Sequence, residues 1–340
     1  MRLSLLLLPL LFACRVELGP PGGGTPAAST ATPKGEVWVY TSMYQSVIDE
    51  LEPQIEAALP GVDVHFYQAG SEKVAQRVEA EWQAGGTKAC LLMTSDPFWY
   101  ADLKARGKLA RHFAPTVLHV ERSLLDPDGY WATSRISLMV MAVNDKVPKD
   151  ARPQRFSDLT DPVWKDRITM GDPLSSGTNF STLAFWVHDA GWDRVQALKD
   201  NGIIAAGGNS SVLTRLETGE RAAGVLLLEN LLVAQRKGSP TVTLFPKDGA
   251  IPVPGPIALT TDCPNPTAAK AVYDYILSPP GQQTMIDGNM YAALKELPPP
   301  TGAPPLSQIA VETWPDGFVD EVARTRGDLK ERYAALISGP

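Results

Sequence analysis

A short polar segment in the middle of the chain carries the residues best suited to bind a ligand. The stretch DPLSSGTNF, residues 172–180, places serines, a glycine and a threonine directly before an apolar run without Pro or Gly. This pattern predicts a helix that begins near Thr178 or Asn179. The first helical turn leaves backbone N–H groups unpaired and carries a partial positive charge, so a phosphate, phosphonate or carboxylate fits there without a basic side chain. The candidate anion-binding residues are Ser175, Ser176, Gly177 and Thr178; the alternative is that these hydroxyls only cap the helix.

Alternating strand and helix patterns must position this segment. Predicted strands at 36–41, 62–67 and 89–94 are each followed by a helical pattern. Three successive units of this kind imply parallel strands covered by helices, which form an α/β lobe. Ligands of such sheets meet the loops after the strands. Those loops add the candidates Ser42, Ser71 and Asp96, of which Ser71 and Asp96 have the alternative role of capping the next helix.

The second half of the chain predicts a second lobe. A long apolar strand at 131–143 could cross between lobes, the segments up to Asn230 alternate strand and helix, and a proline-punctuated strand at 252–259 returns. Trp131–Ser134 and Val253–Ile257 are therefore the hinge candidates. The expected divisions are residues 35–134 plus 257–315 for lobe 1, 135–256 for lobe 2 with its anion-binding helix start, and 316–340 for a C-terminal helical segment.

The N-terminus predicts export. The run Leu3–Phe12 is apolar except for one serine and has about half of the roughly 20 residues that a membrane span needs, which is typical of a signal peptide at 1–13. Leu11-Phe12-Ala13-Cys14 resembles the lipobox of bacterial lipoproteins, in which Cys14 is lipidated. Residues 14–34 then form a flexible Gly-, Pro- and Ala-rich tether. The alternative is an ordinary cleaved signal with an incidental Cys14.

Composition excludes several classes of protein. The net charge of -7 and the absence of a basic run argue against nucleic-acid binding. The four histidines are scattered, and no Gly-x-Ser-x-Gly, P-loop or HExxH motif is present, so we expect no enzyme. Three cysteines are too few for a disulfide scaffold. If Cys14 carries lipid, Cys90 and Cys263 are the one remaining pair, and we expect both to be free buried thiols.

Four motifs carry a resemblance to a known family. They are VWVYTS at 37–42, AGSEKVAQRVEAE at 69–81, DLTDPVWKDRITMGDPLSSGT at 158–178, and GNSSVLTRLETGE at 208–220 paired with NPTAAKAVYDYILSPPGQQ at 265–283. In this order they resemble the type II periplasmic solute-binding proteins of ABC transporters, in the branch with ferric-ion, phosphonate and sugar-phosphate receptors. The resemblance covers about 36–287 and implies an α/β clamshell of two lobes joined by two crossing hinge strands. It further implies a small ligand in the cleft, an ABC transporter permease as partner, and no cofactor; we expect a monomer.

The resemblance also bears on the ligand. In anion-binding members, the segment matching Ser175–Thr178 holds the anion with help from an asparagine that falls on Asn209. Ferric receptors use two adjacent tyrosines after the strand that here ends at Leu228-Glu229, and no such pair exists. Their first-lobe histidine and acidic ligand are replaced by Tyr44 and approximately Ser95. Because ferric iron needs several anionic oxygen or imidazole ligands, we expect no metal site.

Glu229 departs from the pattern of the family in a way that bears on the ligand. A carboxylate at the cleft end of a strand is costly to desolvate unless a cation meets it. An amine on the ligand would serve, which suggests a zwitterion such as an aminophosphonate; the alternative is an ion pair with Arg135 or Arg236. Tyr44 is a candidate aromatic lining residue. The expected function is capture of a small anion by a lipid-anchored receptor of an ABC importer, located in the periplasm or at the outer cell surface. The alternatives are a ferric-ion receptor that uses a synergistic anion and a sensing lipoprotein without a transporter.

Overall fold

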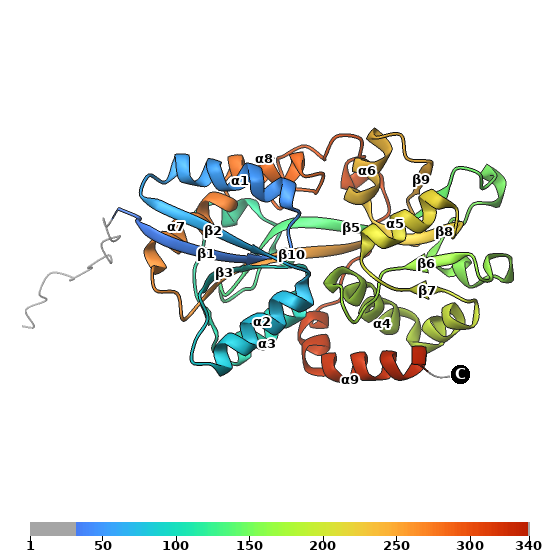
Figure 1. Ribbon diagram of the computed structural model, residues 1–340, viewed down its shortest axis with the longest axis horizontal. Coiled ribbons are helices and arrows are strands. Elements are labelled where there is room, and N and C mark those ends of the chain that lie inside the picture. Colours follow the sequence, from blue (N-terminus) through green and yellow to red (C-terminus); the bar gives the residue numbers. More distant parts are fainter. Residues whose placement is uncertain (1–31, 339–340) are drawn as a thin grey trace, which may run out of the picture. The chain divides into compact units, whose positions relative to one another are not determined.

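The computed structural model describes residues 32–338, which from Pro33 onward belong to one compact unit. Figure 1 shows the helices and strands of this unit gathered into two lobes, with two long strands running through both. The predicted α/β fold with two lobes and two crossing strands is confirmed. Cys14, the predicted signal peptide and nearly all of the predicted tether lie outside the described residues.

Lobe 1 contains the first three strand–helix units. Its strands are β1 (Gly35–Thr41), β2 (Val62–Gln68) and β3 (Ala89–Met93), and β1 pairs in parallel with both of the others. The helices of this lobe are α1 (Gln45–Ala58), α2 (Ser71–Gln83), α3 (Pro97–Ala105), α7 (Pro266–Ile276) and α8 (Pro279–Asp287). The spacing of Val47, Leu51 and Ile55 on α1 predicts one apolar face, and all three are buried.

Lobe 2 is built in the same way around the helix that starts at the polar segment. Its strands are β6 (Ile168–Met170), β7 (Ile204–Ala205), β8 (Ala223–Leu227) and β9 (Thr241–Leu244). Its helices are α4 (Gly177–Asp200), α5 (Asn209–Thr218) and α6 (Leu228–Arg236). The helix α4 begins one residue before the predicted start and is interrupted at Gly191, whose φ of 71° suits glycine.

Two antiparallel strands, β5 (Ala132–Asn144) and β10 (Ile251–Thr260), connect the lobes. With the short β4 (Leu109–Ala110) and β9 at its sides, the ten-stranded sheet of the described residues has the order β2-β1-β3-β10-β5-β8-β6-β7. The pairing of β10 with β5 shifts register between Gly255 and Pro256, opposite Arg135 and Thr133. Such an irregularity bends a strand locally, and this one lies where the sequence predicts the hinge.

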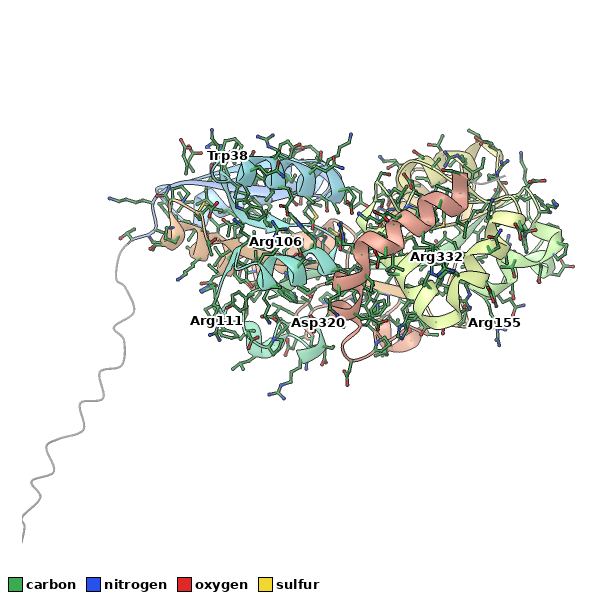
Figure 2. The ribbon with its side chains drawn as sticks, turned by 90° about the horizontal axis from the view of Figure 1, so that it is seen from below. Trp38, Arg106, Arg111, Arg155, Asp320 and Arg332 are labelled. Atoms are coloured by element: carbon green, nitrogen blue, oxygen red, sulfur yellow. A yellow bond between two sulfur atoms is a disulfide. The ribbon has the colours of Figure 1, made fainter. Side chains whose placement is uncertain are left out.

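The C-terminal helix α9 (Phe318–Ser338) packs beside both lobes. Phe318, Val322 and Tyr333 are buried in the core of lobe 2 together with Phe98 from α3 of lobe 1. Figure 2 shows α9 from below, running from the Asp320 end beneath the junction of the lobes toward Arg332. The helix therefore ties the two lobes together on one side.

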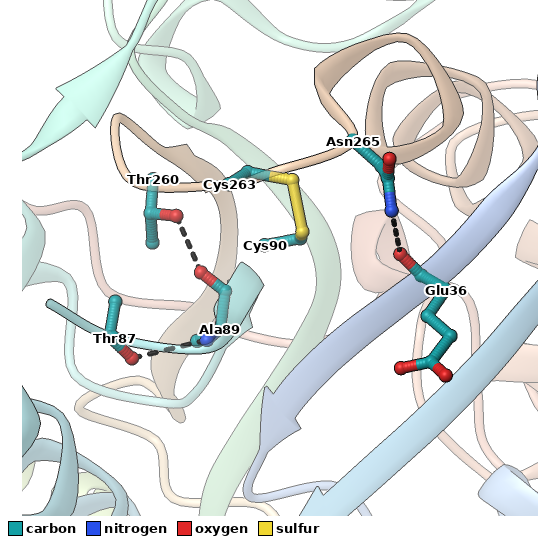
Figure 3. The surroundings of a disulfide bond; sticks show 7 residues. All are labelled: Glu36, Thr87, Ala89, Cys90, Thr260, Cys263 and Asn265. Carbon is teal, nitrogen blue, oxygen red and sulfur yellow. Dashed lines mark hydrogen bonds between the residues drawn. A yellow bond between two sulfur atoms is a disulfide. The ribbon is translucent and has the colours of Figure 1, made fainter.

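The cysteine prediction is wrong. Cys90 in β3 and Cys263 just after β10 form a disulfide, with their Cα atoms 4.4 Å apart (Figure 3). The cause is the antiparallel pairing of β10 with β3, which brings together residues 173 positions apart in the sequence. A bond of this kind suits an exported protein, because disulfides persist in oxidising compartments.

Short 3₁₀ helices of three to five residues also lie at Val117–His119, Arg122–Leu124, Lys149–Ala151, Phe156–Thr160, Pro162–Trp164 and Leu306–Gln308. None of the helices between residues 32 and 338 combines the length and apolarity needed to cross a bilayer.

Candidate functional site

A polar cavity of about 190 Å³ lies between the lobes, at the ends of the strands where the sequence predicts ligand binding. Lobe 1 contributes the segments after β1 and β3 and the start of α2, and lobe 2 contributes the starts of α4, α5 and α6. The cavity is lined by all but one of the candidate residues: Ser42, Tyr44, Ser71, Ser175, Ser176, Gly177, Thr178, Asn209 and Glu229. The sequence candidates thus converge on one place, although their role in binding stays a prediction.

The start of α4 presents unpaired donors to this cavity. Ser176 is the N-cap residue, but its side chain makes no capping bond to the helix backbone. In the described structure, the backbone N–H groups of Gly177, Thr178 and Asn179 have no acceptor. These N–H groups and the helix dipole favour a negative charge at this point.

Side-chain hydrogen bonds hold the hydroxyl groups around the helix start. Asn179 Nδ2 donates to Ser176 Oγ at 2.9 Å, and Asn209 Nδ2 donates to Thr178 Oγ1 at 3.0 Å. Ser176 Oγ and Thr178 Oγ1 lie 3.2 Å apart. Asn179, fully buried, was not a sequence candidate; its position at the predicted start of the helix is the signal that could have found it. The amides fix the hydroxyls on one wall of the cavity.

The facing wall belongs to lobe 1. Ser71 is the first residue of α2 and does not cap it; instead its Oγ accepts a bond from Ser95 N at 3.3 Å. Ser42 Oγ lies 3.5 Å from Ser95 Oγ. A Cβ atom on Gly177 would lie 2.9 Å from both Ser71 Oγ and Ser95 O, so the two walls touch at this glycine.

Arg135 is the site residue that sequence reasoning missed, since it was considered there only as a partner of Glu229. It lies on β5, every residue of which is buried, and is 2% exposed while lining the cavity. Its Nη2 donates to Ser95 Oγ at 2.9 Å, and the guanidinium forms no salt bridge with any described residue. Burial lowers the pKa of Arg135. The available signal was its place as the one charged residue of an apolar strand.

Glu229 is the second buried charge site of the cavity. It is 3% exposed, and Ser137 Oγ donates to its Oε1 at 2.7 Å. Burial raises the pKa of Glu229 to about 7, against the smaller opposing effects of the Ser137 bond and Arg135. In the described structure it forms no salt bridge with Arg135 or Arg236, although Arg135 is near enough to stabilise its carboxylate electrostatically.

Tyr44 crosses the cleft. Its Oη donates to Asn230 Oδ1 at 2.9 Å, which joins the start of α1 in lobe 1 to the start of α6 in lobe 2. Burial and the nearby Glu229 raise the pKa of Tyr44 well above its usual value. The phenol is therefore a neutral hydrogen-bonding group.

Asp96 is the candidate that the structure removes from the cavity. Its carboxylate accepts a bond from Trp99 N as the N-cap of α3. It also accepts from Arg326 Nη2 of α9 at 2.6 Å, and Arg326 bonds Glu72 at 2.7 Å as well. The prediction of Asp96 as a ligand-binding residue fails because its charge is already matched inside the protein.

The described residues that could hold a metal ion do not gather in this cavity. Glu36, Asp63 and His65 form a group of three potential ligands at the opposite, N-terminal end of β1 and in β2. The cavity itself offers Glu229 as its carboxylate and Arg135 as its cation.

The comparison with protein families agrees with this geometry. Residues 36–287 match the sequence profile described as bacterial extracellular solute-binding protein. The chain belongs to this family. Its two-lobe fold is that of the periplasmic solute-binding proteins among the solved structures, as the resemblance predicts.

Solved structures with the same fold include receptors for different ligands. The structure of AfuA from Actinobacillus pleuropneumoniae, with fructose-6-phosphate bound, is 21% identical with a TM-score of 0.79, covering 90% of this chain and all (100%) of that one. Iron-bound HitA from Pseudomonas aeruginosa is 17% identical with a TM-score of 0.78, covering 88% and 99%. These likenesses show the fold.

A curated relative adds a weaker likeness. The phosphoglycerate transport regulatory protein PgtC of Salmonella typhimurium is 24% identical over 210 residues, which are 58% of this chain. The match spans about half (51%) of PgtC.

Proposed function

We propose that the protein captures a small anion bearing a phosphate or phosphonate group between its lobes, as the receptor of an ABC importer. The observation that carries this proposal is the set of donors around the cavity: unpaired amides of α4, fixed hydroxyls, and the buried guanidinium of Arg135 without a carboxylate partner. A phosphate group accepts hydrogen bonds from several donors at once and neutralises the guanidinium. The sugar phosphate bound to AfuA and the name of PgtC are consistent with this chemistry.

Energetics support the participation of both lobes. Hydrogen bonds to a charged group contribute roughly 1.5 to 3 kcal/mol each, so three at α4 give at most about 9 kcal/mol. Association costs about 4 kcal/mol or more. A micromolar receptor needs about 8 kcal/mol net, so α4 alone is insufficient. Arg135 and the serines of lobe 1 supply the remainder, and hinge closure at the register shift of β10 brings the walls together.

Iron is the second ligand to test, because iron-bound HitA has the same fold. Ferric iron prefers several anionic oxygen ligands. Among the described lining residues the cavity offers one carboxylate, Glu229, and a phenol, Tyr44, already bonded to Asn230. Arg135 would repel the cation. The donor set therefore favours an organic anion.

A ligand panel tests the proposal. Thermal shift and titration calorimetry with inorganic phosphate, phosphonates, sugar phosphates and ferric citrate should show stabilisation by phosphate-bearing compounds. Stabilisation by ferric ion alone, or by an uncharged solute alone, would overturn the anion assignment.

The closure step is tested at Gly177. A Gly177→Ala methyl group would meet Ser71 and Ser95 of the opposite lobe, although alanine suits the helix itself. We expect affinity to fall at least tenfold with the melting temperature nearly unchanged. Gly327→Ala on α9, where a Cβ meets nothing within 4 Å, is the matched control. Equal affinities of the two variants would show that the walls do not close here.

We also propose that Cys14 is lipidated after removal of residues 1–13, that residues 14–34 tether the receptor at the outer face of a membrane, and that it acts as a monomer. The sequence at Leu11–Cys14 supports the anchor. Mass spectrometry of the protein from membranes should find diacylglycerol on Cys14, and Cys14→Ser should release the protein. A neighbouring permease and uptake that depends on the receptor would separate transport from sensing.

A further inference from the structure

The hydroxyl groups at the start of α4 are held by a chain of side-chain amides that begins at a backbone group. Asn179 is fully buried and does not line the cavity itself. The backbone N–H of Gly171, just after β6, donates to Asn179 Oδ1 at 3.1 Å. Because a backbone N–H can only donate, this bond fixes which end of the amide is oxygen. A Cβ atom on Gly171 would collide with the amide of Asn179, so glycine leaves the room that this arrangement needs.

The orientation of Asn179 sets the orientation of the groups beyond it. Its Nδ2 donates to Ser176 Oγ at 2.9 Å and to Asn209 Oδ1 at 3.5 Å. Asn209 therefore turns its own Nδ2 toward Thr178 Oγ1, at 3.0 Å. Each of the two hydroxyl oxygens thus accepts a hydrogen bond from an amide, and each hydroxyl keeps its proton to donate.

These hydroxyl protons lack enough acceptors within the protein. Ser176 Oγ and Thr178 Oγ1 lie 3.2 Å apart, and a hydrogen bond between them uses one of the two protons at most. Neither hydroxyl donates to any other described residue. On the facing wall, Ser71 Oγ accepts from Ser95 N and also keeps its proton. A ligand group at the start of α4 therefore meets hydroxyl donors in addition to the unpaired N–H groups.

We propose that Asn179 is a positioning residue that turns the hydroxyls of Ser176 and Thr178 into donors, so that the site at α4 selects an oxyanion whose oxygens carry no proton. This rests on the proposed function. A protonated ligand oxygen would place its own donor against these donors, and a hydrogen bond to a charged group would be lost. Asn179 acts through the two hydroxyls and does not contact the ligand.

The test compares sulfate with inorganic phosphate by calorimetry on the purified receptor at pH 8. Because a phosphate group loses its second proton with a pKa of about 6, inorganic phosphate is then present as hydrogen phosphate. The two ions have the same charge and nearly the same shape, and only hydrogen phosphate has a proton to donate. Wild-type protein should bind sulfate about tenfold more tightly, because hydrogen phosphate makes one hydrogen bond fewer.

Asn179→Asp should change this preference. The new carboxylate still accepts from Gly171, but it can only accept from Ser176, so Ser176 Oγ becomes free to accept a proton from the ligand. The bonds from Gly171 and Ser176 keep the new carboxyl group ionised at pH 8. Its charge repels both ions equally, so the ratio of their dissociation constants reports the orientation of the hydroxyl. The preference for sulfate should fall at least fivefold.

Two further variants accompany this one. Ser176→Ala removes the donor without adding a charge, and the helix loses no capping bond, so the preference for sulfate should fall here as well. Asn144→Asp is the matched control. Asn144 is also buried, accepts from Lys146 N at 3.1 Å and donates to Leu216 O at 2.7 Å, but lies outside the cavity. Its substitution should leave the preference unchanged.

The outcomes separate the two proposals. If wild-type protein binds neither ion at millimolar concentration, the anion site of the proposed function fails and this inference fails with it. If both ions bind but Asn179→Asp and Ser176→Ala keep the wild-type preference, Asn179 does not set the specificity and the anion receptor remains. A fall of the preference in these two variants, but not in Asn144→Asp, supports the proposal, because general damage to the fold would not distinguish ions of equal charge and shape.

Discussion

The protein buries charged side chains in two neighbouring regions, and the two regions differ in whether these charges form ion pairs. Beside α9, Arg326 and Lys330 meet the carboxylates of Glu72 and Asp96 at 2.6 to 2.7 Å. In the cavity, Arg135 and Glu229 are both nearly fully buried, yet each has only uncharged hydrogen-bond partners. The charges of the first region are paired within the protein and we call this region complete. The charges of the second region have no salt-bridge partner and we call it incomplete.

This difference separates a structural charge cluster from a binding site. A buried ion pair stabilises little relative to apolar packing, but loss of one partner is costly. A buried charge without an ionic partner is unfavourable unless something else supplies one. The two regions are also connected, because Glu72 follows Ser71 and Asp96 follows Ser95 along the chain. The paired charges hold the segments whose serines line the cavity.

The largest expected effect is a loss of stability when the ion pairs beside α9, in the complete region, are broken. Arg326→Gln leaves Asp96, 2% exposed, and Glu72, 7% exposed, without their shared guanidinium. Breaking a buried pair typically costs 3 to 5 kcal/mol, and because the Arg326 side chain is 21% exposed we expect about 3 kcal/mol less stability in urea unfolding.

Arg324→Gln, two residues away and exposed on the same helix, is the control and should change stability by less than about 0.5 kcal/mol. Equal stabilities of the two variants would mean that the α9 cluster is not a structural ion pair, and the comparison of the two regions would fail.

Arg135→Gln should show the opposite pattern. The ligand-free protein loses a buried charge that forms no salt bridge, so its unfolding free energy should stay unchanged or rise. Two charge-assisted bonds to the anion are lost, and affinity for a phosphate ester should fall about 100-fold, or about 2.7 kcal/mol. Calorimetry and urea unfolding of one preparation measure both. A variant that unfolds easily but binds normally would make Arg135 a structural residue.

Local signals explain what the sequence could predict. The helix start at Ser175–Thr178 and the loops after the strands depend on neighbouring residues, so the cavity lining could be predicted before any contact was known. The capping role of Asp96 could be predicted from its neighbours, but its ion pair with Arg326, 230 residues away, could not. The same applies to Cys90 and Cys263, which meet only when β10 returns beside β3. Arg135 lacked a local pattern that distinguishes a ligand contact from an internal pair.

The smallest expected effect concerns Glu229 and pH. Burial raises the pKa of this carboxyl group from 4.5 to about 7 in the folded protein. Between these pH values the folded protein keeps a proton that the unfolded chain releases, so stability falls as the pH rises toward 7 and the full loss is present above it. Glu229→Gln removes this loss. Since a buried amide also carries a desolvation cost at every pH, we expect the ligand-free variant to be more stable than wild type by about 2 kcal/mol at pH 8 and less stable by about 1 kcal/mol near pH 4.5.

Urea midpoints at the two pH values measure this difference, with Glu217→Gln as the control because that carboxylate is exposed on α5. If Glu229 instead had an ionic partner inside the protein, as Asp96 does, the Gln variant would be the less stable one at pH 8. The sign of the change at pH 8 therefore decides whether Glu229 belongs with the incomplete charges of the cavity or with the paired charges beside α9.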